Sequence, residues 1–526
     1  MSDDVVLRIS NLRVETRSNV LLDDVSVELR RGEVLGIIGE SGAGKSTLAL
    51  ASIGLLRAGC AATAGSVEMC GHDVLCLSRP ELETVRRNHS SYVAQSAAAA
   101  FNPFYRLEDQ VTELAAMAGK TSPAARRRIA AELFAELQLP DPESFGKRYP
   151  HQVSGGQLQR AMIAMALVNR PYLIIFDEPT TALDVTTQIE VLRLIRKIMR
   201  DHECAALYVS HDLAVVAQMA DRVLVMRQGK MVEQGETREL VVHPSTDYAG
   251  RLVAKHGDGS YAQAPARTDR VLEVRDLSAA YGAKIAMQDV SFTLETGQVM
   301  GLVGESGSGK TTVARVVAGL QPKRSGDILL DNERLAPLVE DRSFDVRRRI
   351  QYIHQLPDLA LNPRHTIREI IGRPLAFFHG LKGSAAEPRL RELSEAIEMP
   401  DSYLARYPSS LSGGQKQRVC IARSLAADPD ILICDEITSA LDPLVEESIV
   451  QLLLRLMDER KLSLLFITHN LGLTKRFAHK VAVMQAGRLV EQNDTKAIFE
   501  APEKDYTRML IAAAPSIEPG WLDRVA

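Results

Sequence analysis

Residues 36–47 read GIIGESGAGKST, and residues 301–312 read GLVGESGSGKTT, so that Lys45 and Lys310 lie 265 residues apart. Three further pairs follow in the same order with a constant offset of 258 residues: RYPHQVSGGQLQR (148–160) with RYPSSLSGGQKQR (406–418), LIIFDEPTTALD (173–184) with LICDEITSALD (432–442), and His211 with His469. Such a long ordered repeat predicts two complete domains of the same fold.

The domain boundaries follow from the repeat and from one polar stretch. We expect a first domain at 1–255, a linker at 256–270 and a second domain at 271–526. The linker sequence, HGDGSYAQAPARTDR, is rich in Gly, Pro and Ala and lacks apolar periodicity, which is typical of a connecting segment.

Each half alternates short β-rich runs with helical stretches, which predicts an α/β fold with a mostly parallel sheet and crossover helices. The expected strands are Glu33–Ile38, Leu173–Phe176 and Ala206–Val209 in the first half, and Val299–Val303, Ile431–Cys434 and Leu464–Ile467 in the second. Between the first two motifs, Ile129, Leu133 and Leu137 recur every four residues, which predicts an amphipathic helix within a helical subdomain.

Composition excludes several classes of protein. The 526 residues are 45% hydrophobic and 25% charged, which is typical of a globular chain rather than a disordered or fibrous one. Lys and Arg number 63 against 67 Asp and Glu, so the net charge of -4 provides no overall attraction for nucleic acid or an anionic membrane. No apolar run approaches the roughly 20 residues that span a bilayer, and six scattered cysteines with no secretory leader favour the cytoplasm.

The two glycine-rich stretches fit the P-loop pattern, because each follows an apolar strand and precedes a helix. Glycines let the backbone amides point at phosphate oxygens, the lysine reaches the β and γ oxygens, and the next hydroxyl ligates Mg²⁺. The candidate nucleotide-binding residues are Gly39, Ser41, Gly42, Gly44, Lys45, Ser46 and Thr47 in the first half, and Gly304, Ser306, Gly307, Gly309, Lys310, Thr311 and Thr312 in the second.

An Asp-Glu pair ends an apolar strand in each half. Asp177 and Asp435 are placed to hold Mg²⁺ together with Ser46 and Thr311, whereas Glu178 and Glu436 are placed to orient and polarise an attacking water. The repetition of His211 and His469 favours a contact to the γ-phosphate over a structural role. The motifs together predict hydrolysis at the γ-phosphorus of a bound nucleotide with Mg²⁺, and because both halves retain them we expect two competent sites.

Between these motifs, Ser154–Gln157 and Ser412–Gln415 both read SGGQ, and with them nearly the whole chain resembles the ATP-binding cassette (ABC) ATPases. That family implies an antiparallel β region in each domain. It implies further that Gln95 and Gln355 are Q-loop glutamines that join the metal shell, and that Asp184 and Asp442 are D-loop aspartates. It also implies a head-to-tail sandwich, in which Ser412, Gly413, Gly414 and Gln415 complete the site of Lys45, and Ser154, Gly155, Gly156 and Gln157 complete that of Lys310.

The tails narrow the resemblance. HPSTDYAGRLV (243–253) and APEKDYTRMLIAAAP (501–515) are similar to the segment that follows the cassette in importers of oligopeptides, dipeptides and nickel. This implies an energy-coupling subunit on the cytoplasmic face of the inner membrane, with two integral membrane permease partners, a solute-binding protein and no nucleic acid. Because no cysteine follows Cys434, we expect no iron-sulfur cluster, and the spacing of Cys60, Cys70 and Cys76 matches no standard zinc site.

Two positions depart from the family. Where relatives stack an aromatic ring on adenine, the second half has Tyr281 but the first has Thr16. We therefore expect weaker nucleotide binding at the Lys45 site, unless Arg17 or another nearby group takes the place of the ring. After Gln95, four alanines (97–100) stand where relatives have a more polar loop that faces the membrane partner, and two interpretations stay open: altered coupling to that partner, or no effect.

Two other functions share part of this pattern. A soluble tandem cassette that acts on ribosomes or nucleic acid typically has a long charged helical linker, whereas 256–270 is short and not basic. An exporter ATPase uses the same motifs, and only the tails disfavour it. The transported substrate does not follow from these residues.

Overall fold

The computed structural model describes residues 4–117, 122–180, 183–254, 261, 269–439 and 441–525. The chain forms two compact units: unit 1 comprises Met1–Gly257 and Pro515–Ala526, and unit 2 comprises Asp258–Ala514. Most of the expected linker lies outside the described residues, and the first strand of unit 2 already begins at Arg270. The final twelve residues, expected in the second domain, belong to unit 1.

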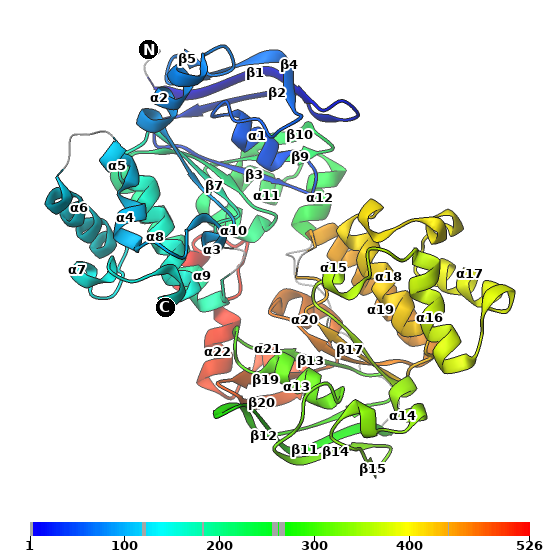
Figure 1. Ribbon diagram of the computed structural model, residues 1–526. Coiled ribbons are helices and arrows are strands. Elements are labelled where there is room, and N and C mark those ends of the chain that lie inside the picture. The colour runs from blue at the N-terminus through cyan, green and yellow to red at the C-terminus, as the bar shows by residue number, and fades with distance from the viewer. Residues whose placement is uncertain are drawn as a thin grey trace. The chain divides into compact units, whose positions relative to one another are not determined.

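Unit 1 combines a six-stranded sheet, in the order β10-β9-β3-β8-β7-β6, with a four-stranded antiparallel sheet, in the order β2-β1-β4-β5 (Figure 1). Within the larger sheet only the β9–β10 pair is antiparallel. The strands are β1 (Val5–Glu15), β2 (Val20–Arg30), β3 (Val34–Gly39), β4 (Ala61–Met69), β5 (His72–Asp73), β6 (Ser90–Val93), β7 (Leu173–Asp177), β8 (Ala205–Val209), β9 (Arg222–Arg227) and β10 (Lys230–Glu236).

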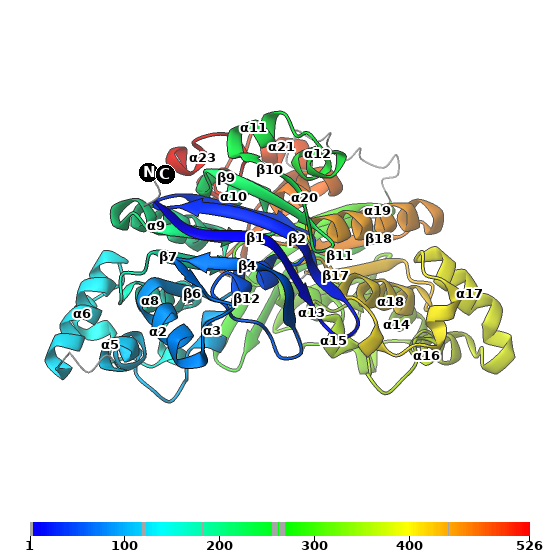
Figure 2. The same ribbon diagram turned by 90° about the horizontal axis from the view of Figure 1, so that it is seen from above.

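The helices of unit 1 follow the strands in chain order. They are α1 (Lys45–Ala51), α2 (Arg79–His89), α3 (Ala97–Ala100), α4 (Leu107–Val111), α5 (Glu113–Met117), α6 (Pro123–Glu136), α7 (Pro142–Phe145), α8 (Gly155–Leu167), α9 (Val185–His202), α10 (Leu213–Met219), α11 (Thr237–Val242), α12 (Asp247–Ala254) and α23 (Trp521–Arg524). Figure 2 shows α11 and α12 beside the β9–β10 hairpin.

Unit 2 repeats this arrangement, with sheets in the orders β16-β17-β18-β13-β19-β20 and β12-β11-β14-β15. Its strands are β11 (Arg270–Tyr281), β12 (Lys284–Glu295), β13 (Val299–Val303), β14 (Ser325–Leu330), β15 (Glu333–Arg334), β16 (Ile350–Ile353), β17 (Ile431–Asp435), β18 (Ser463–Ile467), β19 (Lys480–Gln485) and β20 (Arg488–Asp494). Its helices are α13 (Lys310–Val317), α14 (Phe344–Arg349), α15 (Pro357–Ala360), α16 (Ile367–His379), α17 (Glu387–Ala396), α18 (Gly413–Leu425), α19 (Pro443–Arg460), α20 (Leu471–Phe477), α21 (Thr495–Glu500) and α22 (Asp505–Ala512).

The central strands form because their sequences are apolar on both faces, as a parallel sheet covered by helices requires. Every residue of β3, β7 and β8 is buried, and so is every residue of β13, β17 and β18. The six strands expected from the sequence match these elements to within one residue at each end. The α/β fold with two tandem cassette-like domains is therefore confirmed.

The helical subdomain of unit 1 comprises α4 to α8, which lie together on one side of the unit, away from the four-stranded sheet (Figure 1). Within α6, Leu133 and Phe134 are buried, and Phe134 packs edge-to-face on Phe145 of α7 with ring centroids 5.1 Å apart. A helix is thus present where one was expected, but of the expected apolar residues only Leu133 is buried within it: Ile129 is half-buried, and the buried Leu137 lies just beyond its end.

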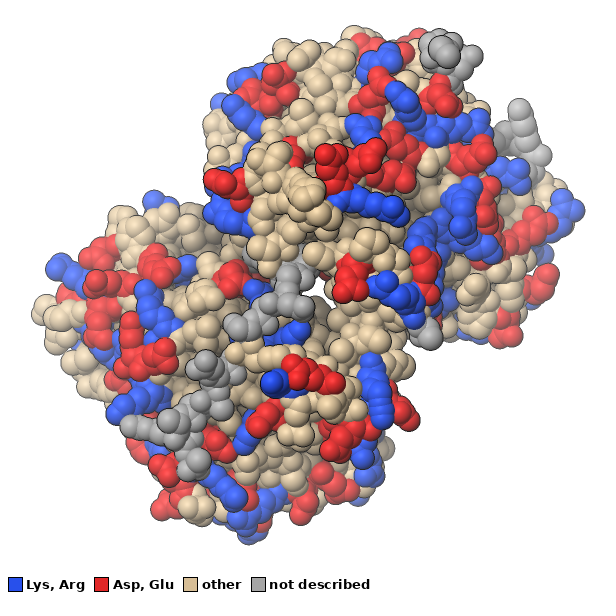
Figure 3. All heavy atoms as spheres, turned by 180° about the vertical axis from the view of Figure 1, so that it is seen from behind, with Lys and Arg blue, Asp and Glu red and all other residues tan. Residues whose placement is uncertain are grey.

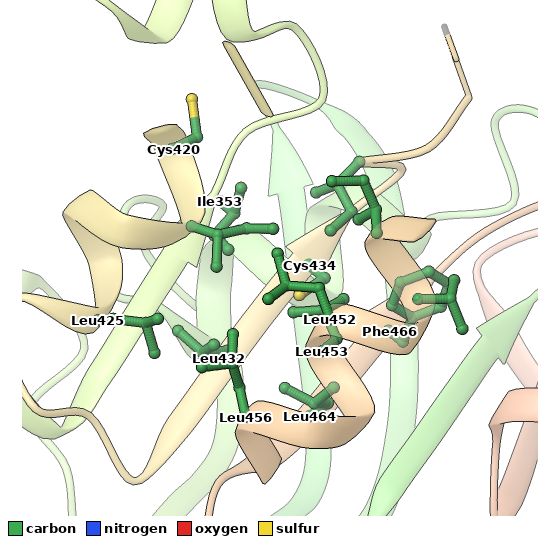
Figure 4. Close-up of a cluster of buried hydrophobic side chains, with 14 of the residues drawn as sticks. Ile353, Cys420, Leu425, Leu432, Cys434, Leu452, Leu453, Leu456, Leu464 and Phe466 are labelled. Carbon is green, nitrogen blue, oxygen red and sulfur yellow. The ribbon is translucent and has the colours of Figure 1, made fainter. Parts of the chain in front are cut away.

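Unit 2 shows how helices cover the parallel sheet. In Figure 4, Leu452, Leu453 and Leu456 of α19 lie over Leu432 of β17 and Leu464 of β18. All five side chains are at most 1% exposed. Burying such leucines contributes about 1.5–3 kcal/mol each, which fixes the sheet whose strand ends carry the candidate site.

The C-terminal segment packs on unit 1. The Gln218 side chain of α10 donates through Nε2 to the carbonyls of Ser516 and Glu518, 2.8 Å from each, and its Oε1 accepts the Leu522 amide. The Arg193 side chain of α9 donates to the Leu522 carbonyl at 3.1 Å. Trp521 is 6% exposed. The segment therefore buries an aromatic side chain on unit 1, and the side chains of Gln218 and Arg193 bond to its backbone groups. No helix in the described part of the chain is long and apolar enough to cross a bilayer.

The single tryptophan of the chain therefore reports on this segment. Exposure of Trp521 to water moves its fluorescence emission to longer wavelength. In a urea titration we expect this shift to occur at a lower urea concentration in Gln218→Ala than in the wild type, because the variant loses three hydrogen bonds to residues 516–522. Each backbone group left unpaired costs about 1–3 kcal/mol. Asp523→Ala is the control, since its ion pair with Arg196 is exposed and worth about 0–1 kcal/mol. Equal unfolding midpoints for both variants would contradict the docking.

Candidate functional site

The first P-loop joins β3 to α1. Gly44, with φ of 98°, precedes the helix, and a Cβ there would come 2.8 Å from the Leu21 carbonyl oxygen, so only glycine fits. The loop carries Ser41 and Gly42, and Ser46 and Thr47 lie in the first turn of α1. The Lys45 ammonium is buried and donates to the carbonyls of Gly39 and Glu40 at 2.7 and 2.9 Å. These bonds hold the lysine at the start of the loop.

The second P-loop repeats this geometry between β13 and α13. Gly309 has φ of 106°, and the Lys310 ammonium donates to the carbonyls of Gly304 and Glu305, both at 2.8 Å. Burial lowers the pKa of Lys310, although the nearby carboxylates oppose the shift. Ser306 and Gly307 lie in the loop, and Thr311 and Thr312 in the first turn of α13.

The candidate Mg²⁺ ligands of unit 1 lie together at the end of β7. The Ser46 hydroxyl donates to Asp177 Oδ1 at 3.1 Å, and Asp177 Oδ2 accepts from the Tyr92 hydroxyl at 2.7 Å. Gln95, the third candidate ligand, donates to Glu178 Oε2 at 3.0 Å. One carboxylate, one hydroxyl and one amide oxygen suit Mg²⁺, which otherwise takes water and phosphate ligands.

Unit 2 places the equivalent donors in the same pattern. Thr311 donates to Asp435 Oδ1 at 3.1 Å, the Tyr352 hydroxyl donates to the other oxygen of Asp435, and Gln355 donates to Glu436 Oε2 at 2.8 Å. Burial and the hydrogen bond to the aspartate raise the pKa of Tyr352. The hydroxyl therefore remains a donor at neutral pH and fixes the carboxylate orientation.

Sequence reasoning missed Tyr92 and Tyr352. Their common signal is their position three residues before Gln95 and Gln355 in both halves.

The candidate water-orienting glutamate of unit 1 faces the repeated histidine. Glu178 has φ of 50° and donates its backbone N–H to Val209 of β8 at 2.9 Å, which turns its side chain out of the strand end. His211 Nδ1 lies 3.2 Å from Glu178 Oε1. Burial lowers the pKa of His211, but the hydrogen bond and charge of Glu178 outweigh it, and the net shift is upward.

In unit 2 the same pair is looser. His469 Nδ1 lies 3.9 Å from Glu436 Oε1, and the His469 side chain is 47% exposed against 29% for His211. The neighbouring His469 is the main cause that lowers the pKa of Glu436, so this carboxylate is ionised at neutral pH. An ionised carboxylate beside an imidazole can accept and relay a proton from water.

The SGGQ motifs form the N-termini of α8 and α18. Ser154 accepts the Gln157 amide through Oγ at 3.3 Å, and Gln157 Oε1 accepts the Ser154 amide at 3.1 Å. Ser412 and Gln415 form the same reciprocal pair at 3.4 and 3.0 Å. Each pair is a capping box, which stabilises the start of its helix. Helix stability alone therefore accounts for a serine and a glutamine at these positions.

The two glycines of each SGGQ motif differ in what surrounds them. A Cβ on Gly156 would come 2.2 Å from Thr187 Cγ2, and one on Gly414 would come 2.4 Å from Val445 Cγ1, so both are required by packing. At Gly155, by contrast, a Cβ would meet no described atom within 4 Å, and at Gly413 it would meet only Leu441 at 3.7 Å. The fold does not require the first glycine, which suits close approach of a ligand to the backbone.

The candidate D-loop aspartates, Asp184 and Asp442, lie next to these motifs. Asp184 caps α9, accepting from the backbone and hydroxyl of Thr187, both at 3.0 Å, and Asp442 caps α19 through the Val445 amide at 3.1 Å. Burial raises the pKa of Asp184, but the hydrogen bonds from Thr187 and Thr186 bring it below its usual value. Through Thr187 and Val445, each aspartate is linked to the packed glycine of its own unit.

The two candidate adenine positions differ. Tyr281 ends β11 and is 52% exposed, whereas Thr16 uses its hydroxyl in a turn, accepting the Asn19 amide at 3.0 Å.

We expect variants with a single remaining site to bind ATP unequally. Lys310→Ala, which keeps the Lys45 site, should bind ATP more weakly than Lys45→Ala, which keeps the Lys310 site, by about 1–3 kcal/mol. Thr16→Tyr in the Lys310→Ala background should recover affinity, with Ser18→Tyr in the same turn as control. Equal titration curves for the two lysine variants would contradict the asymmetry.

A model of the ABC transporter family matches residues 22–181 and 287–439. The glutathione import ATP-binding protein GsiA of Shigella dysenteriae serotype 1 (strain Sd197) is 36% identical over 566 residues, which cover 98% of this chain and 90% of that protein. GsiA of Salmonella choleraesuis (strain SC-B67) is 36% identical over 567 residues with the same coverage. Among solved structures, the ATP-binding cassette MJ0796, in a dimeric post-hydrolysis state with ADP and Pi, aligns with 44% of this chain and 99% of its own at 27% identity and a TM-score of 0.40.

Proposed function

Because this chain belongs to the ABC transporter family and carries two of its ATP-binding cassettes, we propose that it is the energy-coupling ATPase of an importer of glutathione or similar small peptides. The substrate class rests on the GsiA relatives, which are named for glutathione import and match along nearly the full chain. Importer ATPases act at the cytoplasmic face of the inner membrane, and we propose that location here.

The observation that carries the ATPase assignment is the duplicate cluster at the strand ends. In each unit a buried lysine, a hydroxyl bonded to an aspartate, and a glutamate paired with a histidine follow the ends of three neighbouring strands: β3, β7 and β8 in unit 1, and β13, β17 and β18 in unit 2. The lysine neutralises phosphate, Ser46 or Thr311 with its aspartate would hold Mg²⁺, and the glutamate takes the proton of water. Mg²⁺ would supply charge neutralisation of the β and γ oxygens.

We propose further that the two halves of the chain close on ATP in a head-to-tail manner, so that Ser412–Gln415 complete the Lys45 site and Ser154–Gln157 complete the Lys310 site. The unoccupied space beside Gly155 supports this, because the fold itself leaves that glycine without a packing role. A backbone amide at the start of a helix can then reach the γ-phosphate that one P-loop leaves open.

Two integral membrane permeases and a solute-binding protein are the proposed partners. Beyond Gln95 the chain exposes Phe104, 85% accessible, and beyond Gln355 it exposes Leu359, 83% accessible. Large apolar side chains this exposed suit a protein interface. They lie in the segment that, in this family, faces the membrane partner, and α3 with its four alanines belongs to the same segment.

The permease interface has a direct test. We expect Phe104→Asp with Leu359→Asp to abolish co-purification of two integral membrane proteins in mild detergent, because a charge in an apolar contact costs several kcal/mol. Val242→Asp is the control, since Val242 of α11 is also exposed, at 65%.

If ribosomes rather than membrane proteins co-purify with the wild-type chain, the importer proposal fails in favour of the soluble alternative. On the face drawn in Figure 3, basic and acidic side chains are intermixed, which gives that alternative no support.

The substrate has a separate test. A reconstituted complex should hydrolyse ATP faster when its binding protein carries glutathione than when it carries no ligand. Stimulation by a larger oligopeptide or a nickel chelate, with none by glutathione, would contradict the proposed substrate class.

A further inference from the structure

In each unit, a tail helix that follows the antiparallel hairpin of the larger sheet carries a tyrosine that contacts the P-loop. In unit 1, the Tyr248 hydroxyl of α12 accepts a hydrogen bond from the Glu40 amide at 3.2 Å. In unit 2, the Tyr506 hydroxyl of α22 accepts from the Glu305 amide at 3.4 Å. The two tyrosines are 4% and 8% exposed, so both contacts are shielded from solvent.

The residue that the tyrosine contacts is also the one that holds the lysine. Glu40 donates its N–H to Tyr248 and accepts from the Lys45 ammonium through its carbonyl, 2.9 Å away. Glu305 stands in the same way between Tyr506 and Lys310, with the lysine bond at 2.8 Å. A single peptide segment therefore connects the tail helix to the phosphate-binding ammonium in each unit.

The tail is itself fastened to the sheet by a repeated carboxylate. Glu233 of β10 accepts the backbone amides of Ser245 and Thr246, at 2.8 and 3.0 Å, just before α12 begins. Glu491 of β20 accepts the amides of Glu503 and Lys504, at 2.8 and 3.1 Å, just before α22. Carboxylates that accept backbone amides make strong hydrogen bonds, so the start of each tail helix is fixed relative to the sheet.

A cation–π contact also holds the tyrosine of unit 1. The Arg227 guanidinium at the end of β9 lies 5.0 Å from the centroid of the Tyr248 ring. Burial raises the pKa of Tyr248 to about 12, so its hydroxyl keeps its proton at neutral pH. The tail thus presents a rigid neutral acceptor to the Glu40 amide.

We propose that Tyr248 and Tyr506 are positioning residues for ATP binding, which act through Glu40 and Glu305 to set the P-loop so that Lys45 and Lys310 meet the phosphates. The inference rests on the proposed role of these lysines. It assigns the tail helices a part in nucleotide affinity, in addition to any part in packing.

The test removes only the hydroxyl. Tyr248→Phe in the Lys310→Ala background, and Tyr506→Phe in the Lys45→Ala background, should raise the Kd and KM for ATP about two- to tenfold, the size of one lost hydrogen bond. The kcat at saturating ATP should stay unchanged, because the tyrosine does not touch the reacting atoms. Tyr172→Phe, a half-exposed tyrosine before β7, is the matched control.

A second measurement does not depend on activity. Hydrogen exchange of the peptide that spans residues 36–47 should speed up in Tyr248→Phe and remain at the wild-type rate in Tyr172→Phe. Glu233→Gln, which weakens the attachment of the tail, should shift both exchange and Kd in the same direction as Tyr248→Phe.

The outcomes separate the two proposals. If Lys45→Ala and Lys310→Ala bind ATP as the wild type does, the proposed site fails. If each lysine variant loses one of the two binding sites, but the added Tyr→Phe substitution leaves the Kd and the exchange rate of its parent variant unchanged, the site stands and the positioning role is wrong. A fall in kcat with unchanged KM would also overturn it.

Discussion

Replacing Glu436 and Glu178 together by glutamine is expected to reduce ATP turnover by about 10²–10⁴-fold, the usual contribution of a positioned base. Each carboxylate lies beside a histidine and accepts a hydrogen bond from Gln95 or Gln355, so the amide keeps the shape of the side chain while it loses the proton acceptor. Binding of ATP should persist, because the lysines and the hydroxyl–aspartate pairs are untouched. Phosphate release and equilibrium binding, measured on the same preparation, check both parts.

Each unit has a second glutamate with a positive φ, which serves as a matched control for the unusual backbone conformation of Glu178 and Glu436. Glu203 and Glu398 also have positive φ, 49° and 56°, but lie at the end of α9 and just after α17. Glu203→Gln with Glu398→Gln should leave turnover near the wild-type level. Turnover of the Glu178→Gln, Glu436→Gln variant at the wild-type rate would refute the assigned role.

A glutamate in place of the first SGGQ glycine is expected to silence the site on the opposite P-loop. In the Lys310→Ala background, which keeps only the Lys45 site, Gly413→Glu should lower hydrolysis about 10²-fold or more, as loss of an oxyanion donor does. Gly155→Glu in that background should have little effect. The added carboxylate repels the γ-phosphate without a packing clash, because a Cβ at either glycine finds room.

The reciprocal experiment completes the test. In the Lys45→Ala background, Gly155→Glu should silence hydrolysis and Gly413→Glu should not. Gly235→Glu and Gly372→Glu are controls, since a Cβ at these positions also meets no described atom within 4 Å. If each substitution instead impaired the P-loop of its own half, the head-to-tail arrangement would be wrong.

Much of the fold was accessible from local sequence, for a physical reason. Strands such as β13 and β17 are short apolar runs buried on both faces, so their limits coincide with the change from apolar to polar residues. The proximity of Ser46 to Asp177 was also predictable, because a P-loop and the end of a neighbouring parallel strand meet at one edge of the sheet.

The features that sequence reasoning missed depend on contacts between distant segments. Tyr248 meets Glu40 across 208 positions and Gln218 meets Ser516 across 298, and neither pair has a local pattern. The different Glu–His distances, 3.2 and 3.9 Å, arise in motifs that are almost identical. Such differences come from packing around the motif, which the motif itself does not encode.

Residues 515–525 belong to unit 1 although they follow unit 2 in the sequence. The chain therefore cannot be separated into two independent halves at the boundary that the sequence repeat indicates. If the two cassettes were produced as separate polypeptides, cut between 257 and 258, the second would carry a peptide ligand for α9 and α10 of the first, and the first would lose the cover that Trp521 and Leu522 provide. A circular permutant that transfers this peptide to the amino-terminal half would restore each half as a self-contained fragment.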